Sequence, residues 1–194
     1  NKSRLFIVKQ NRFNLPVKKL YKTIQSGRFG KLILGTIRLR WARHQQYYDL
    51  DDWRGTKNLD GGVLANQASH HIDLLQYMMG DIKSVYAMTE KRLLRIETED
   101  TAIALVKFKN NSLGVIEATT ATRPENLEGS ISILGENGTV VIAGKSVNKI
   151  ETWNFNKAIK EDETIKRNFS ENPNDIYGYG HKEFYSHVYK TISS

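Results

Sequence analysis

The feature that most constrains the fold is a series of short strand-like segments in the second half of the chain, separated by turn-forming residues. Two of the junctions read as hairpin turns, namely Asn110-Asn111 and residues 135–138, Gly-Glu-Asn-Gly. Short segments rich in β-branched and aromatic residues, joined by such turns, predict neighbouring antiparallel strands. The expected strands are residues 85–91, 101–108, 114–122, 130–134, 139–142 and 150–155.

The first half of the chain predicts helices and one long strand. Residues 31–41 alternate apolar with polar or basic side chains, which predicts a strand with one apolar and one partly basic face. Pro16 opens a stretch with apolar residues every three or four positions, and Gly27 ends it, as a helix requires. Further helices are expected at residues 62–79 and 177–194, and a further strand at residues 5–8, closed by Gln10-Asn11-Arg12.

These elements together predict an α+β domain. We expect an open, mostly antiparallel mixed sheet of six or more strands with helices on one face. The length of 194 residues suits one domain, and a hydrophobic content of 39% is enough for a core. No apolar run approaches the roughly 20 residues of a membrane helix, so a membrane partner is not expected.

Charge and cysteine content narrow the function. The chain has no cysteine, which excludes disulfides and thiolate metal sites. Its formal net charge of +8 suits nucleic acid, anionic lipid or phosphorylated metabolites. The lysines and arginines are scattered along the chain, which favours a solvated surface combined with an anionic small substrate over a nucleic-acid partner.

The helix expected at residues 62–79 carries a polar stripe beside its apolar one. Asn66, His70, Asp73 and Tyr77 share one face, and a histidine in such a position suits proton transfer near neutral pH. The spacing alone fits an ordinary amphipathic helix with a solvated polar face equally well. His71 points about 100° away from His70, so the two would not share a metal ion, and no metal site is expected.

The segment at residues 42–60 has little periodicity, and a loop of this length is usually functional or mobile. It contains Arg43, Tyr48, Trp53 and Arg54. Arginine can bind a carboxylate or phosphate through two parallel hydrogen bonds, and aromatic rings can stack on a sugar. The same residues could equally anchor a surface loop to the core.

The residues around the polar stripe resemble a known motif. Gly61-Gly62, Asn66, His70 and Asp73 match the pattern of the C-terminal domain of the glucose–fructose oxidoreductase, inositol dehydrogenase and rhizopine catabolism (GFO/IDH/MocA) family, although many members have Asp where this chain has Asn66. The run at residues 53–56, Trp-Arg-Gly-Thr, makes the resemblance closer to bacterial UDP-N-acetyl-2-amino-2-deoxyglucuronate dehydrogenases of surface-polysaccharide synthesis. The resemblance covers almost the whole chain.

This resemblance implies a cytoplasmic, NAD(P)-dependent enzyme that oxidises the C3 hydroxyl of a nucleotide sugar in lipopolysaccharide O-antigen biosynthesis. It implies that residues 1–194 form the substrate-binding and oligomerisation half, pairing through the sheet into a dimer or tetramer. NAD would be bound mainly by a Rossmann domain preceding Asn1, because this chain lacks the glycine-rich fingerprint. The chain alone is then expected to be inactive.

The resemblance also assigns roles to individual residues. His70 is the expected acid/base residue, and Trp53 and Arg54 are expected to face the cofactor. The candidate substrate-binding residues are Arg12, Arg43, Tyr48, Asn66, Gln67 and Ser69. Two alternatives remain open: a related enzyme acting on another sugar or a cyclitol, and a non-catalytic basic binding module.

Overall fold

The computed structural model describes residues 4–144, 147–173 and 178–193. Within these residues, seven strands form one open sheet in the order β2-β3-β4-β1-β5-β6-β7. Strands β1 and β4 pair in parallel, and the other neighbours are antiparallel. The strands are β1 (Leu32–Arg40), β2 (Ile82–Glu90), β3 (Thr101–Phe108), β4 (Leu113–Thr119), β5 (Glu128–Gly135), β6 (Gly138–Ala143) and β7 (Lys149–Phe155).

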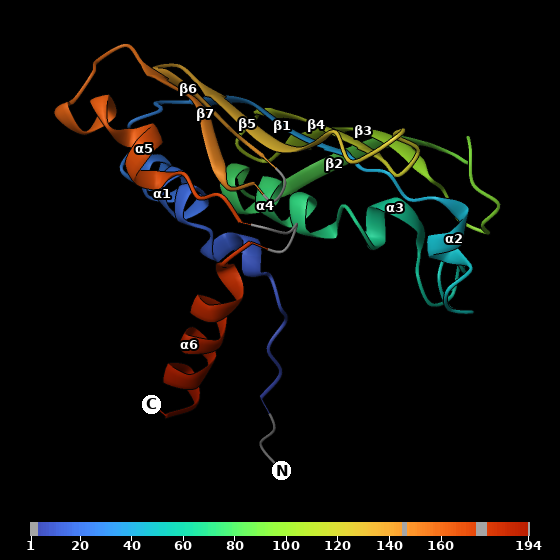
Figure 1. Ribbon diagram of the computed structural model, residues 1–194. Coiled ribbons are helices and arrows are strands. Elements are labelled where there is room, and N and C mark those ends of the chain that lie inside the picture. Colours follow the sequence, from blue (N-terminus) through green and yellow to red (C-terminus); the bar gives the residue numbers. More distant parts are fainter. Residues whose placement is uncertain (1–3, 145–146, 174–177, 194) are drawn as a thin grey trace.

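The helices lie on one side of this sheet. Figure 1 shows α1, α4 and α5 beneath one face, the opposite face bare, and α6 extending away on the helical side together with the N-terminal residues. The predicted α+β fold is therefore confirmed. The helices are η1 (Gln10–Phe13), α1 (Leu15–Gln25), α2 (Gln45–Tyr48), α3 (Gly62–Ala65), α4 (Ser69–Met79), η2 (Lys160–Glu163), α5 (Ile165–Phe169) and α6 (Gly180–Ser193).

The core lies between α1, α4 and the centre of the sheet. Leu20 of α1 and Leu74 of α4 are fully buried with Ile37 of β1. A β-carbon at Gly35 would come within 2.8 Å of the side chains of Leu75 and Met79. The absence of a side chain at Gly35 therefore lets α4 sit close to β1, which fixes the height of α4 above the sheet.

The bare face of the sheet is apolar in places. Ile103 and Leu105 on β3 are 53% and 56% exposed, whereas their neighbours Ala104 and Val106 point into the core. Strand β2 lies at the edge of the sheet and is exposed on both faces, including Tyr86 and Met88. Among the described residues, no helix is both long and apolar enough to cross a bilayer.

Both predicted hairpins are confirmed. Strand β3 has the predicted bounds, and Asn111 turns the chain into β4 with a left-handed φ of 69°. The side-chain oxygen of Asn110 accepts a hydrogen bond from the Ser112 backbone N–H at 3.0 Å, which closes this turn. Residues 135–138 connect β5 to β6 as an antiparallel pair.

The strand predicted at residues 5–8 is wrong. Residues 4–9, the N-terminal segment, are irregular, with Leu5 86% exposed. Figure 1 shows this segment running away from the sheet, so it has no neighbouring strand with which to pair. Gln10, Asn11 and Arg12, predicted to close that strand, instead belong to the short helix η1.

The single helix predicted at residues 62–79 is also wrong, because the chain breaks it into α3 and α4. Asn66 leaves the helical conformation, with φ −92° and ψ −85°. The hydroxyl of Ser69 then donates a hydrogen bond to the Asn66 carbonyl at 2.9 Å. This local bond favours a turn at residues 66–68 over a continuous helix.

One smaller prediction needs adjustment. In the strand predicted at residues 31–41, the alternation places Ile33 on the apolar face with Ile37 and Leu39, but Ile33 is 55% exposed, at a register shift between Leu32 and Leu34 in the pairing with β5. The C-terminal helix is confirmed from Gly180, while Tyr177 and Ser194 lie outside the described residues.

Candidate functional site

A two-glycine turn positions the start of α3. Gly61 and Gly62 both have left-handed φ values, 75° and 80°. The carboxylate of Glu99 accepts a hydrogen bond from the Leu64 N–H at 3.1 Å, and the Glu99 carbonyl accepts one from Val63 at the same distance. A β-carbon on Gly62 would lie 2.2 Å from this carboxylate. The two glycines therefore allow both the left-handed backbone of this turn and its close packing against Glu99.

His70 occupies the first turn of α4 and is half-buried. Its Nδ1 is buried and has no hydrogen-bond partner among the described residues. Burial lowers the pKa of His70, the Lys9 ammonium lowers it further, and the Asp73 carboxylate partly offsets both. The lowered pKa favours the neutral form of the imidazole, which is the form that can accept a proton.

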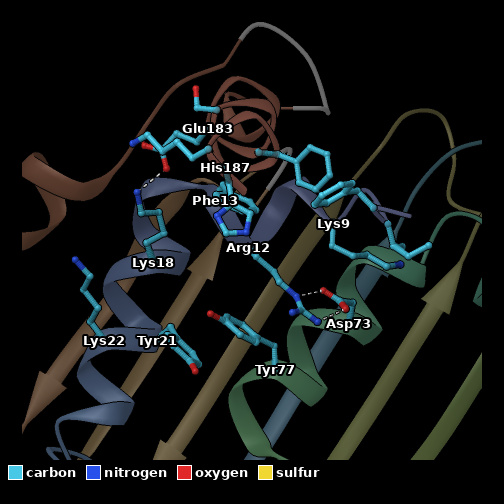
Figure 2. A pocket seen from close by; sticks show the side chains of 15 residues that line it. Lys9, Arg12, Phe13, Lys18, Tyr21, Lys22, Asp73, Tyr77, Glu183 and His187 are labelled. Atoms are coloured by element: carbon cyan, nitrogen blue, oxygen red, sulfur yellow. Dashed lines mark hydrogen bonds and ion pairs between the residues drawn. The ribbon is translucent and has the colours of Figure 1, made fainter. Parts of the chain in front are cut away.

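Asp73, one helical turn after His70, holds Arg12 in a bidentate ion pair. The guanidinium Nε and Nη2 donate to the two carboxylate oxygens at 2.7 and 2.6 Å, which raises the pKa of Arg12. The same guanidinium lies over the Tyr77 ring at 4.4 Å, and Tyr77 stacks on Tyr21 at 4.1 Å. Figure 2 shows Arg12 held between Asp73 and Tyr77. Arg12 thus joins η1 to α4, and only its remaining donor atoms can reach a substrate.

Sequence reasoning missed the contribution of the residues just before Arg12. The side-chain oxygens of Gln10 and Asn11 are buried and unpartnered within the described chain, as are both amide atoms of Gln67. Helix η1 packs on α4, which carries His70, and Gln67 lies in the turn just before α4. Buried polar atoms are normally hydrogen-bonded, which makes this group a candidate for binding a polar ligand. No periodicity in the sequence distinguished Gln10 and Asn11.

Asn66 and Ser69 have partners within the chain. The Asn66 amide donates a short hydrogen bond to Asp60, whose other carboxylate oxygen accepts from the Gly55 N–H at 2.6 Å. Asp60 therefore joins the turn before α4 to the loop that contains Arg54. The Ser69 hydroxyl donates to Asn66, as described above.

The loop residues form a second group. Tyr48 is buried, its hydroxyl lies 3.2 Å from that of Thr120, and burial raises its pKa. Arg43 lies over Trp41 and Tyr47 at 5.1 and 5.2 Å. Tyr48 therefore anchors the loop to the end of β4, while Arg43 keeps donors that are only partly used.

Trp53 and Arg54 are held on the outer side of this loop. Arg54 donates to Asp51 at 2.7 Å and lies over the Trp53 and Tyr47 rings at 4.7 and 4.3 Å. The Trp53 side chain is 39% exposed. Arg54 and Tyr48 line a cavity of about 470 Å³, whereas Arg12 and Asp73 line a different cavity of about 960 Å³. Asp60 thus joins the Asn66 turn to this loop, whereas the residues around Arg54 and those around Arg12 line separate cavities.

His71 lies on a different side of α4 from His70 and faces the core. It is 1% exposed, and its ring meets Trp41 edge-on at 6.0 Å. Burial lowers its pKa to about 4, and neither ring nitrogen has a partner among the described residues. Within those same residues, no cluster of three or more His, Asp or Glu side chains is arranged to hold a metal ion.

Comparison with known proteins identifies the fold and the motif together. Residues 17–141 match the model of the GFO/IDH/MocA C-terminal domain. The chain belongs to this family. That match includes β1, α4 and His70, so the predicted family resemblance is confirmed.

Several solved structures are similar over most of the chain. The WlbA dehydrogenase of Chromobacterium violaceum, solved with NADH and UDP-GlcNAcA, is 42% identical with a TM-score of 0.88, covering 98% of this chain and 53% of that one. The corresponding complex from Bordetella pertussis is 46% identical with a TM-score of 0.81, covering 84% and 48%. This chain therefore spans about half the length of these proteins.

A more distant similarity links the chain to a curated enzyme. The myo-inositol 2-dehydrogenase of Thermotoga maritima is 28% identical over 118 residues, which are 58% of this chain and 33% of the relative. The similar proteins therefore include dehydrogenases solved with a bound nucleotide sugar and a dehydrogenase named for a cyclitol.

Proposed function

We propose that this chain is the substrate-binding domain of an NAD-dependent nucleotide-sugar dehydrogenase that oxidises the C3 hydroxyl of a UDP-N-acetylglucosaminuronate-type substrate. The observation that carries the proposal is His70, whose Nδ1 is buried and has no partner among the described residues, and whose pKa is lowered by burial. The identity to the two WlbA dehydrogenases supports the substrate class. Surface-polysaccharide biosynthesis in the cytoplasm remains the predicted context.

In this proposal His70 acts as the general base. Oxidation of a carbinol removes the hydroxyl proton and a hydride from carbon as the carbonyl forms, and His70 takes the proton. Such a positioned base is typically worth about 10²–10⁴-fold in rate. The amide groups of Asn11 and Gln67 would orient the sugar hydroxyls, because their buried atoms lack other partners in the described part of the chain.

NAD, when bound, would supply the hydride acceptor for this oxidation. We propose that Trp53, whose ring is partly exposed, and Arg54, which stacks on it, would contact the nicotinamide side of the cofactor. The remaining contacts would come from a Rossmann domain in a longer protein, of which residues 1–194 form the substrate-binding and oligomerisation half. The isolated chain is accordingly proposed to be inactive.

The substrate proposal is tested with the full-length protein that contains this chain. NADH formation is followed by absorbance with UDP-GlcNAcA, UDP-GlcNAc, myo-inositol and D-apiose as separate substrates. We expect oxidation of UDP-GlcNAcA with the highest kcat/KM. A higher kcat/KM for a cyclitol or a free sugar would refute the substrate assignment while keeping the enzyme class.

A further inference from the structure

Lys9 is a cation next to the proposed catalytic residue. It ends the N-terminal segment and is half-buried. Its ammonium lies 3.5 Å from the carbonyl oxygen of Ser69, the residue that precedes His70. This contact is at the long limit of a hydrogen bond, so it leaves ammonium protons free to bind another acceptor.

The charged groups around His70 leave the positive charge of Lys9 unpaired. Arg12 neutralises Asp73 through the bidentate ion pair, and Lys18, which lines the same cavity as Lys9 and Arg12, pairs with Glu183 at 2.5 Å. Lys9 makes no ion pair with a carboxylate among the described residues. Figure 2 places Lys9 beside the Arg12–Asp73 pair and apart from Lys18.

Lys9 and the N-terminus of α4 bring positive charge to the same place. The Lys9 ammonium lies at the first turn of α4, where the helix dipole is positive and disfavours a cation. An anion at the same place would interact favourably with both the ammonium and the helix N-terminus. The arrangement therefore favours an anionic ligand over a neutral one.

We propose that Lys9 recognises an anionic group of the sugar that binds at His70 and so selects acidic substrates. This inference rests on the proposed function for the position of the sugar, and Lys9 is a residue that the sequence did not single out. The anionic group is a hexuronate carboxylate or the diphosphate of the nucleotide. A neutral sugar or cyclitol would leave the ammonium uncompensated.

Binding of such an anion has a consequence for His70. The charged groups that act on His70 are Lys9 from the N-terminal segment, Asp73 on α4 and His181 on α6, and Arg12 of η1 is paired with Asp73. Lys9 and His181 lower the pKa of His70, and Asp73 raises it. An anion that neutralises Lys9 should therefore raise the pKa of His70 and make the imidazole a stronger base.

The first test measures substrate affinity in the full-length protein. Lys9→Met should weaken UDP-GlcNAcA binding about ten- to a hundredfold, as expected for one lost charge-assisted hydrogen bond, and Lys9→Arg should restore most of it. Lys22→Met is the matched control, because Lys22 lines the same cavity but is not among the groups that act on His70.

Comparison with UDP-GlcNAc identifies the anionic group. Weaker binding of UDP-GlcNAcA alone assigns the carboxylate to Lys9, whereas equal weakening of both ligands assigns the diphosphate. Unchanged affinity for both ligands in Lys9→Met would overturn the proposal, as would equal losses in Lys9→Met and Lys22→Met.

A second test does not depend on catalysis. NMR titration of the His70 imidazole in the 194-residue chain should show a higher pKa in Lys9→Met than in the original chain. D-glucuronate or inorganic phosphate should raise this pKa in the original chain and not in Lys9→Met, and D-glucose should have no effect. Identical titrations in both chains contradict the role of Lys9, whereas failure of the full-length protein to oxidise any nucleotide sugar contradicts only the proposed function.

Discussion

His70 and His71 are adjacent in the sequence but occupy different environments. His70 is half-buried at the beginning of α4, with charged groups from the N-terminal segment, α4 and α6 acting on it. His71 is enclosed by the core beside Trp41, where the charged form of the ring is strongly disfavoured. His70 therefore retains access to a ligand, whereas the protonation of His71 is coupled to the stability of the fold.

The burial of His71 predicts a stability that falls with acidity. Its pKa is lowered to about 4 in the folded chain, whereas the unfolded chain has the ordinary value near 6.5. Because the unfolded state binds the proton more readily, the free energy of unfolding should fall as the pH drops below about 6.5 and level off below the folded pKa. Between pH 7 and pH 5 the expected loss is about 2 kcal/mol.

Urea unfolding at both pH values measures this loss, with His71→Phe as the comparison. The variant removes the titrating ring and keeps an aromatic side chain next to Trp41, so its unfolding free energy should depend less on pH by about the same amount, roughly 2 kcal/mol. Equal pH dependence in the two proteins would show that His71 does not titrate as proposed.

At the scale of elements, the turn between α3 and α4 and the Gly61-Gly62 turn before α3 determine where His70 lies. Gly62 has a left-handed φ of 80°, and a β-carbon there would contact the Glu99 carboxylate at 2.2 Å. Gly27 has a similar φ of 73°, but a β-carbon at Gly27 would meet no other atom within 4 Å. Substitutions at the two glycines therefore distinguish the cost of a left-handed backbone from the cost of steric overlap.

This pair gives a matched prediction. Gly27→Ala should cost about 1 kcal/mol of unfolding free energy, from the left-handed backbone alone. Gly62→Ala should cost roughly 2–4 kcal/mol, because Glu99 must also move and its hydrogen bond to Leu64 is disturbed. Denaturant unfolding measures both values, and equal costs would mean that the contact with Glu99 is unimportant.

The sequence predicted the sheet better than the helix that carries the site. Strand β3 and the turn at Asn110-Asn111 follow from alternation and turn chemistry, both of which are local. The break at Asn66 was missed because Leu64 and Ala68 continue the apolar pattern of α4 across it. The apolar run at residues 5–8 also led to a wrong strand prediction. A strand needs a neighbouring strand to pair with, and the local sequence does not show whether one is present.

The same limit applies to the candidate site. His70 and Asp73 are part of a motif and were predicted together, whereas Lys9, Gln10 and Asn11 come close to α4 only through the packing of η1. The ion pair between Arg12 and Asp73 spans 61 positions in the sequence, so its partner could not be inferred from spacing. The substrate and cofactor roles of the predicted residues remain proposals.

At the scale of the whole molecule, the bare face of the sheet is the main unpartnered surface of the described chain. Ile103, Leu105 and Leu113 are each more than half exposed there, beside the exposed edge strand β2. We propose that a second copy covers this face, as the family resemblance implies, because exposed apolar patches of this kind commonly mark interfaces.

Leu105→Glu should therefore lower the molar mass in solution without unfolding the chain, since Leu105 points away from the core. Analytical ultracentrifugation of the full-length protein measures the mass, and Leu59→Glu, on a loop and 73% exposed, is the control. An oligomer of unchanged mass in Leu105→Glu would contradict the proposed interface.

His70 is the residue on which the proposed activity depends most, and His70→Asn in the full-length protein tests its role most directly. Steady-state kinetics with UDP-GlcNAcA should show kcat reduced about 10²–10⁴-fold, because the base is lost, while calorimetric affinity for the sugar changes little. A kcat close to that of the original protein would contradict the assignment of His70 as the catalytic base.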